Sequence, residues 1–265
     1  MSTFFEKIND LDILLHCDGY EREYFFAECS RLAYKGQKLA SKEFKKVGFT
    51  SYKFCSVEGA QCHIVKNRDY IVIAFRGTEP RQFSDIKADL MAWKRKSRTE
   101  GHVHAGFKNE LDKLWADIKM GLSRKGDRTI FLCGHSLGGA IATVCASRLE
   151  KDVEELYTYG SPRVGGDIFR DNLLVDHCRV VNNNDMVAKV PFWFIGYRHH
   201  GYLTYINHYG NIRELTSWQK LKDQIRGRWC ALRKFQMFDG IRDHDINKYC
   251  KKLKSLVKIE PTFGD

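Results

Sequence analysis

A serine between two glycines, set between an apolar run and a helix-forming segment, most constrains what this chain can fold into. The segment 134–138 (Gly-His-Ser-Leu-Gly) follows the apolar run 129–133 and precedes 140–149, which has the small residues that a helix needs to pack on a sheet. A strand that reverses into a helix within one residue has strained backbone angles, and flanking glycines remove the side chains that would collide there. The pattern predicts a strand, a sharp turn and a helix, with the Ser136 hydroxyl at the tip of the turn.

The length and composition of the chain fit one α/β domain. The chain has 265 residues, of which 43% are hydrophobic and 13% aromatic, so it can bury a large core. We therefore expect a single domain over residues 1–265. Apolar stretches stay well short of the roughly 18 residues of a transmembrane helix, and the first residues lack the basic-then-apolar order of a secretory signal. Neither a membrane span nor export is expected.

The cysteine pattern and the net charge indicate the cellular location and the kinds of partner to expect. The nine cysteines are an odd number without paired short spacings, which is typical of free thiols in a reducing compartment. We expect a cytoplasmic protein or one at the periphery of a membrane. The formal net charge of +11 attracts anionic partners such as phospholipid headgroups or nucleic acid. Because no zinc-finger, RNP or helix-turn-helix pattern accompanies the basic clusters, no nucleic-acid partner is expected.

Helix-like and strand-like segments alternate along the chain. Helical patterns lie at 20–34, 108–122 and 169–175, and strand patterns lie at 61–66, 70–75, 129–133, 155–159, 177–181 and 202–206. This alternation predicts an α/β fold with a mostly parallel central sheet and helices on both faces.

A serine at such a turn needs a histidine to take its proton and a carboxylate to hold that histidine in the right tautomer. Asp185 is the best candidate for the acid, because it follows the strand 177–181 and catalytic groups gather at the carboxyl ends of parallel strands. A plain turn aspartate is the alternative, since Asp favours turns. Other acids after Ser136 lie in segments typical of turns or solvated helix faces: Asp167, Asp171, Asp176 and Asp223.

Chain order alone leaves four histidines as candidates for the base: His199, His200, His208 and His244. His244 fits best, because it lies in the polar turn 239–245 between two amphipathic segments, where a loop lets the imidazole reach the sheet edge. His199 and His200 begin a strand pattern, and His208 lies in a hairpin turn. The alternative for His244 is a residue at a helix N-terminus with no catalytic part.

Catalysis at such a serine also needs two backbone N–H groups that face the developing oxyanion. Leu137, the residue after the nucleophile, is expected to supply one of them. Thr78 is our candidate for the other, because the strand 70–75 ends in a glycine turn at Gly77.

A set of motifs in a fixed order gives the chain a resemblance to a known family. They are 75–78 (Phe-Arg-Gly-Thr), 103–107 (Val-His-Ala-Gly-Phe), 134–140, 160–165 (Gly-Ser-Pro-Arg-Val-Gly), 184–185 (Asn-Asp) followed by 190–191 (Val-Pro), 198–201 (Arg-His-His-Gly), and 243–244 (Asp-His) with Tyr249. With these motifs, which cover about residues 60–250, the chain resembles the class 3, or fungal-type, lipases of the α/β-hydrolase fold.

The resemblance implies roles for the candidate residues. Ser136 becomes the nucleophile, Asp185 the acid and His244 the base, with Thr78 and Leu137 at the oxyanion hole. Neither a metal nor an organic cofactor is implied. His102 and His104 look like a metal pair, but the family places a histidine before Gly-Phe for packing. Arg76 and Arg163 are expected to brace loops through hydrogen bonds to carbonyls or carboxylates.

The segment 80–101 is a candidate helical lid. Apolar residues recur there at helical spacing, and lipases of this family cover the site with such a helix. These residues are Phe83, Ile86, Leu90 and Trp93. A lid that opens would present its apolar face to lipid, and the basic run after Trp93 would favour anionic headgroups; a fixed packing helix is the alternative. The basic segment 217–237 has an apolar stripe that fits either a helix packed on the sheet or one on a membrane surface.

Residues and resemblance together predict a serine carboxylic ester hydrolase that cleaves acyl lipid esters through an acyl-enzyme. Triacylglycerol or monoacylglycerol lipase, phospholipase A1 and short-chain or aromatic esterase stay open, because loops shape the acyl pocket. The expected partners are an acyl lipid or ester substrate and an anionic membrane surface. A second hypothesis, from another class, is a peripheral anionic-lipid binding protein on an inactive hydrolase scaffold.

Overall fold

A computed structural model describes residues 4–8, 11, 20–78, 93–212 and 242–257, and a seven-stranded sheet runs through this part of the chain. The strands are β1 (Ser51–Val57), β2 (Ala60–Lys66), β3 (Tyr70–Phe75), β6 (Thr129–His135), β7 (Val153–Tyr159), β8 (Asp176–Asn182) and β9 (Tyr202–Ile206), and they lie in this order. β1, β2 and β3 pair antiparallel, whereas β3, β6, β7, β8 and β9 pair parallel. The carboxyl ends of the parallel strands therefore meet at one edge.

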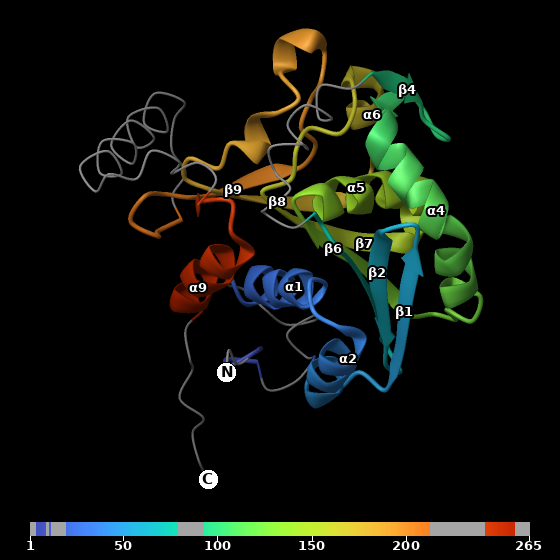
Figure 1. Ribbon diagram of the computed structural model, residues 1–265, viewed down its shortest axis with the longest axis vertical. Helices are drawn as coiled ribbons and strands as arrows, with labels where there is room; N and C mark the ends of the chain where they lie inside the picture. Colours follow the sequence, from blue (N-terminus) through green and yellow to red (C-terminus); the bar gives the residue numbers. More distant parts are fainter. Residues whose placement is uncertain (1–3, 9–10, 12–19, 79–92, 213–241, 258–265) are drawn as a thin grey trace.

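Helices cover both faces of the sheet (Figure 1). One core contains residues of α1 (Glu21–Leu32), α2 (Gln37–Lys46) and α9 (Ile246–Leu256), and the other contains residues of α4 (Ala105–Leu122) and α5 (Leu137–Leu149). In β3, Val72 and Ala74 belong to the first core, and Ile71 and Ile73 to the second. Because both faces of the sheet are covered, the central strand β3 is apolar and buried throughout, whereas β7 and β8 carry polar residues near their first ends.

Shorter elements connect this framework. A two-stranded sheet pairs β4 (Lys94–Lys96) with β5 (His102–His104), α6 (Asp167–Asp171) precedes β8, and single helical turns lie at Glu150–Asp152, Val187–Lys189 and Trp193–Ile195. The seven described cysteines carry free, buried thiols. Within the described residues, no helix combines the length and the apolar character that crossing a bilayer requires.

The expected α/β architecture is confirmed, but several of its elements differ from the expectation. α2, β1 and the β4–β5 pair were not expected from the sequence pattern. The helix expected at 169–175 is instead α6, which ends at Asp171, because Asn172 bonds back to the Ile168 carbonyl and closes the turn. Of the candidate lid 80–101, residues 80–92 lie outside the described residues, and 93–101 contain β4. The segment 217–237 lies wholly outside them.

Candidate active site

Ser136 lies on the turn between β6 and α5, as the sequence pattern predicts. Its φ of 59° and ψ of −131° are the strained angles that a sharp strand-to-helix turn requires. The backbone N–H of Ser136 donates to the Tyr159 carbonyl oxygen at 2.9 Å, which fixes the turn to β7. The side chain is at the carboxyl edge of the sheet, where the next parallel strands also end.

Two glycines allow this turn because backbone passes where a side chain would stand. A Cβ on Gly138 would overlap the Phe75 carbonyl oxygen and lie 2.8 Å from the carbonyl carbon of Arg76. A Cβ on Gly134 would lie 2.7 Å from the Gly139 nitrogen. These separations are shorter than van der Waals contact, so the glycines that the motif requires are needed for packing between β3, β6 and α5.

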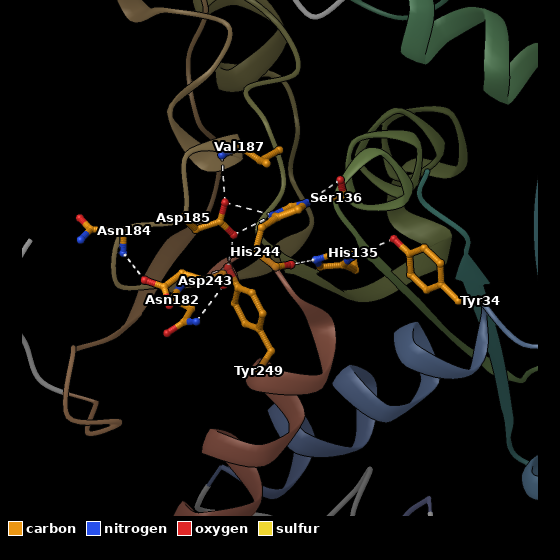
Figure 2. A network of polar contacts seen from close by, with 10 residues as sticks. All are labelled: Tyr34, His135, Ser136, Asn182, Asn184, Asp185, Val187, Asp243, His244 and Tyr249. Atoms are coloured by element: carbon orange, nitrogen blue, oxygen red, sulfur yellow. Dashed lines mark hydrogen bonds and ion pairs between the residues drawn. The ribbon is translucent and has the colours of Figure 1, made fainter. Parts of the chain in front are cut away.

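A hydrogen-bonded row joins Ser136, His244 and Asp185 (Figure 2). The Ser136 hydroxyl lies 2.8 Å from His244 Nε2, and His244 Nδ1 lies 2.9 and 3.0 Å from the two Asp185 carboxylate oxygens. All three side chains are buried, and Asp185 is fully inaccessible to solvent. Since Nδ1–H donates to the carboxylate, Nε2 is left as an acceptor for the serine proton, which is the arrangement of a nucleophile with its base.

Asp185 is held by further donors. Tyr249 of α9 donates its hydroxyl hydrogen to Oδ2 at 2.5 Å, and the backbone N–H of Val187 donates to Oδ1 at 2.9 Å. The Tyr249 hydroxyl also accepts the Asn182 N–H at 3.1 Å. Burial and the Asp185 carboxylate raise the pKa of Tyr249 well above its ordinary value, so Tyr249 stays a donor. A Cβ on Gly160 would lie 2.8 Å from His244 Nδ1, so that glycine makes room for the acid and base.

The backbone of His244 is fixed from the opposite side by His135, which precedes the serine. His135 Nε2–H donates to the His244 carbonyl oxygen at 2.6 Å, and His135 Nδ1 accepts from the Tyr34 hydroxyl at 2.8 Å (Figure 2). Burial and the neighbouring His244 lower the pKa of His135 well below its ordinary value, so it is neutral and keeps one tautomer. The two imidazole rings lie 4.4 Å apart.

Asp243, next to the base, ties its loop to the loop that carries the acid. Its carboxylate accepts from the Asn183 side chain at 3.0 Å and from the Asn184 N–H at 3.3 Å, and its carbonyl accepts from Asn182 Nδ2 at 2.8 Å. These bonds join two segments that are far apart in the sequence. The loop after β8 and the start of α9 therefore position acid and base together.

The two expected oxyanion donors lie beside the serine. Leu137 is the first residue of α5, so its backbone N–H is one of the first-turn groups that have no partner inside the helix. Thr78 follows Gly77, and a Cβ on Gly77 would lie 3.2 Å from the Ser136 Cβ. The loop after β3 thus passes the serine at Gly77, and the oxyanion-hole roles of Leu137 and Thr78 stay predictions.

The other candidates lie in other surroundings. His199 Nε2 bonds to the Ala188 carbonyl oxygen at 2.8 Å and His200 Nδ1 faces His177 Nδ1 at 3.1 Å; both precede β9 rather than begin it. His208 lies in the turn after β9. Asp176 is the first residue of β8 and not a turn, whereas Asp167 and Asp171 form ion pairs with arginines on α6; Asp223 is not among the described residues.

Three further residues of the motifs serve packing and loop structure. His104 accepts the Gly106 N–H at 3.1 Å and stacks on Phe107 at 4.2 Å, as expected of a packing histidine. Arg163 donates to the carbonyl oxygens of Lys189 and Pro191, and Arg76 donates to the Gln61 side chain at 2.6 Å. Arg163 thus braces the loop 189–191 through carbonyl oxygens, as expected, whereas Arg76 bonds to a side-chain amide on β2, which differs from the expected carbonyl or carboxylate.

Comparison with known proteins finds similarity to lipases over part of the chain. The family profile described as lipase (class 3) matches residues 72–195. A secreted mono- and diacylglycerol lipase of Fusarium solani is 42% identical over 106 residues, which are 37% of this chain and 32% of that protein. The lipase of Rhizomucor miehei is 30% identical over 147 residues, or 49% of this chain and 40% of that protein. The matches to the first curated relatives span about a third of their length.

Solved structures show a similar fold. A propeptide complex of the Rhizomucor miehei lipase superposes with a TM-score of 0.61 and 20% identity, and the match covers 72% of this chain and 69% of that one. The sheet, its flanking helices and the serine turn define an α/β-hydrolase fold. The match to the class 3 lipase profile extends over residues 72–195, which include Ser136 and Asp185 but not His244.

Proposed function

We propose that this protein is a carboxylic ester hydrolase that cleaves acyl lipid esters through an acyl-enzyme. The observation that carries the proposal is the row from Ser136 Oγ through His244 to Asp185, with separations of 2.8 and 2.9 Å. Relatives named as mono- and diacylglycerol lipases favour a glycerolipid ester as substrate. A chloroplastic phospholipase A1 of Arabidopsis thaliana, 34% identical over 110 residues, keeps phospholipid esters as the second candidate.

Each side chain has a defined task in this reaction. His244 Nε2 takes the Ser136 proton as the serine oxygen attacks the ester carbonyl, and Asp185 stabilises the imidazolium that forms. The N–H groups of Leu137 and Thr78 would hold the oxyanion. Collapse of the tetrahedral intermediate releases the alcohol, which takes the proton from His244. Water activated by His244 then attacks the acyl-enzyme and releases the fatty acid.

Hydrolysis of p-nitrophenyl esters tests the assignment. The Ser136→Ala variant should lose activity by roughly 10⁴-fold or more, because the nucleophile is gone. Ser123→Ala, at an exposed serine on the end of α4, is the matched control and should keep full activity. Undiminished hydrolysis by Ser136→Ala would refute the proposal and favour a lipid-binding protein on an inactive scaffold. Esters of increasing chain length, then monoacylglycerol and phospholipid, would rank the substrates.

We propose contact with an anionic membrane surface through the loop tip 192–195. Phe192, Trp193, Phe194 and Ile195 are 37%, 64%, 65% and 39% exposed, although all are large and apolar. In Figure 1 this tip lies in the orange turn that projects at the top. The turn is held by Arg198, which donates to the Trp193 carbonyl at 2.7 Å, and by Lys94, which donates to the Gly196 carbonyl at 2.8 Å.

Two features match this tip to an anionic bilayer. It belongs to the loop that connects Asp185, the candidate acid, to β9. Lys94 bonds to it directly, and Arg95 and Lys96 on β4 are exposed. Aromatic side chains beside basic ones suit the interface between headgroups and acyl chains. A peripheral membrane or cytoplasmic location fits this surface together with the buried free thiols.

Vesicle binding tests the membrane contact. The double variant Trp193→Ala and Phe194→Ala should bind phosphatidylglycerol vesicles at least roughly tenfold more weakly, because two apolar side chains no longer insert. Its hydrolysis of soluble p-nitrophenyl acetate should not change. Leu174→Ala is the control, since Leu174 is 91% exposed but lies before β8, at the opposite edge of the sheet. Equal binding by the double variant and the native protein would contradict the contact.

A further inference from the structure

A small cavity beneath the loops after β7 and before β9 has an unusual lining. The space open to the centre of a water-sized species is about 10 Å³, so the cavity has room for one small species. The basic residues that line it are Arg170, Arg179, Arg198, His177, His199 and His200. Hydroxyl groups of Thr143 and Ser161 also line it, whereas no carboxylate is among its described lining residues. The cavity is separate from the row that joins Ser136, His244 and Asp185.

Most of these basic groups have an ion-pair or hydrogen-bond partner within the protein. Arg170 and Arg198 form ion pairs with Asp167 at 3.0 Å. His177 bonds to the Thr158 hydroxyl at 2.8 Å and to His200 at 3.1 Å, and His199 bonds to a backbone carbonyl. Burial and nearby positive charge lower the pKa of His177 and His199 well below the ordinary value, so both are neutral.

Arg179 is the exception. Among the described residues, its guanidinium has no hydrogen-bond acceptor and no carboxylate partner, and its Nε is fully buried. Burial and the neighbouring Arg163 lower the pKa of Arg179 to about 10, which still leaves it charged at neutral pH. A buried charge without a counterion is strongly unfavourable, so a fold that keeps one needs compensation from elsewhere.

The strand register shows why the protein supplies no counterion. Arg179 of β8 pairs with Leu203 of β9, so the nearest position on the neighbouring strand holds an apolar side chain. Neighbouring strands are about 4.8 Å apart, which places the Leu203 side chain beside the start of the arginine side chain. A carboxylate at position 203 could reach the guanidinium, whereas leucine cannot neutralise it.

We propose that this cavity binds a small inorganic anion of the halide class, with chloride as the natural occupant, against Arg179. A water molecule could accept the hydrogen bond but would leave the charge uncompensated. Phosphate and sulfate are too large for the volume. The site needs no catalytic residue, so it is independent of the proposed hydrolase activity.

Thermal unfolding in chloride tests the proposal. The midpoint temperature of unfolding should be higher in sodium chloride than in sodium gluconate at equal ionic strength. The difference should level off with increasing chloride as the site fills, because a ligand that binds only the folded state stabilises it. Arg179→Met should abolish the difference between the two salts. Arg95→Met, which removes an exposed arginine, should keep it. A midpoint that depends on ionic strength but not on the anion would overturn the proposal.

A second pair of variants replaces the anion with a side chain. Leu203→Glu should raise the midpoint in gluconate and remove the response to chloride, because the new carboxylate fills the role of the anion. Leu203→Gln has the same shape without the charge and should keep the chloride response. In crystals soaked in bromide, an anomalous peak is expected beside Arg179; its absence, or a chloride response that survives in Arg179→Met, would contradict the site.

Discussion

At the scale of single residues, local patterns indicated the candidate nucleophile, whereas its supporting contacts became visible only in the fold. Ser136 could be predicted because its motif is contained in one short segment. Asp185 and His244 could be chosen from chain order and from their place after a strand and before a helix. Tyr34 and His135 received no role, because their contact with each other and with the His244 backbone joins distant parts of the chain. Such contacts leave no periodic signal in a sequence.

The prediction at this scale concerns the hydroxyl group of Tyr249. Tyr249→Phe removes the hydroxyl that donates to Asp185, and a hydrogen bond to a charged group contributes about 1.5 kcal/mol. We expect kcat for p-nitrophenyl butyrate to fall roughly tenfold with little change in KM, because the acid holds the base less firmly. Tyr157→Phe is the control: it also loses a bond to a carboxylate, Glu155, but away from the site. Equal kcat values in both variants would argue against a positioning role.

At the scale of elements, the buried strands could be predicted and the partly exposed ones could not. β3 and β6 appear as apolar runs because helices cover both faces of the sheet, and β7, β8 and β9 keep shorter apolar stretches among polar residues. β1 is an edge strand with only Cys55 buried, so its sequence lacks both an apolar run and strict alternation. The boundary of α6 was misjudged because Leu173 and Val175 are buried without being helical.

The prediction at this scale concerns the turn between β6 and α5. A Cβ on Gly138 would overlap the backbone of β3, so Gly138→Ala should displace the serine turn. We expect a loss of at least about 2 kcal/mol in the free energy of unfolding, measured in urea, and a loss of esterase activity in the protein that remains folded. Gly36→Ala is the matched control, because a Cβ there meets nothing within 4 Å. A Gly138→Ala protein as stable and active as Gly36→Ala would contradict the close packing.

At the scale of the whole molecule, the fold class could be predicted from the sequence, but the strand order could not. The order of strands depends on which of them pair across long separations, as in the pairing of β3 with β6. The buried histidines are also a property of the whole fold. Burial lowers the pKa of His63 to about 4, and it lowers those of His135, His177 and His199 well below the ordinary value.

These buried histidines predict how stability depends on pH. Below about pH 6.5 the unfolded chain protonates His63, whereas the folded protein does not until about pH 4. The unfolded state therefore binds more protons in this window, and His63 makes the free energy of unfolding fall as the pH is lowered through it. In His63→Gln the slope between pH 4.5 and 6 should decrease by about 1.4 kcal/mol per pH unit, measured by urea unfolding. An unchanged slope would show that His63 is protonated in the folded protein.

The central claim is that His244 and Asp185 make one hydroxyl, that of Ser136, reactive toward acyl compounds. Labelling with a fluorophosphonate followed by peptide mass spectrometry tests it most directly, because the reagent forms a stable bond only with an activated serine. The account predicts one adduct per chain, on Ser136, which is absent from Ser136→Ala and forms at least roughly a hundredfold more slowly in His244→Gln. Native protein that takes up no label, or takes it up at another serine, would contradict the account.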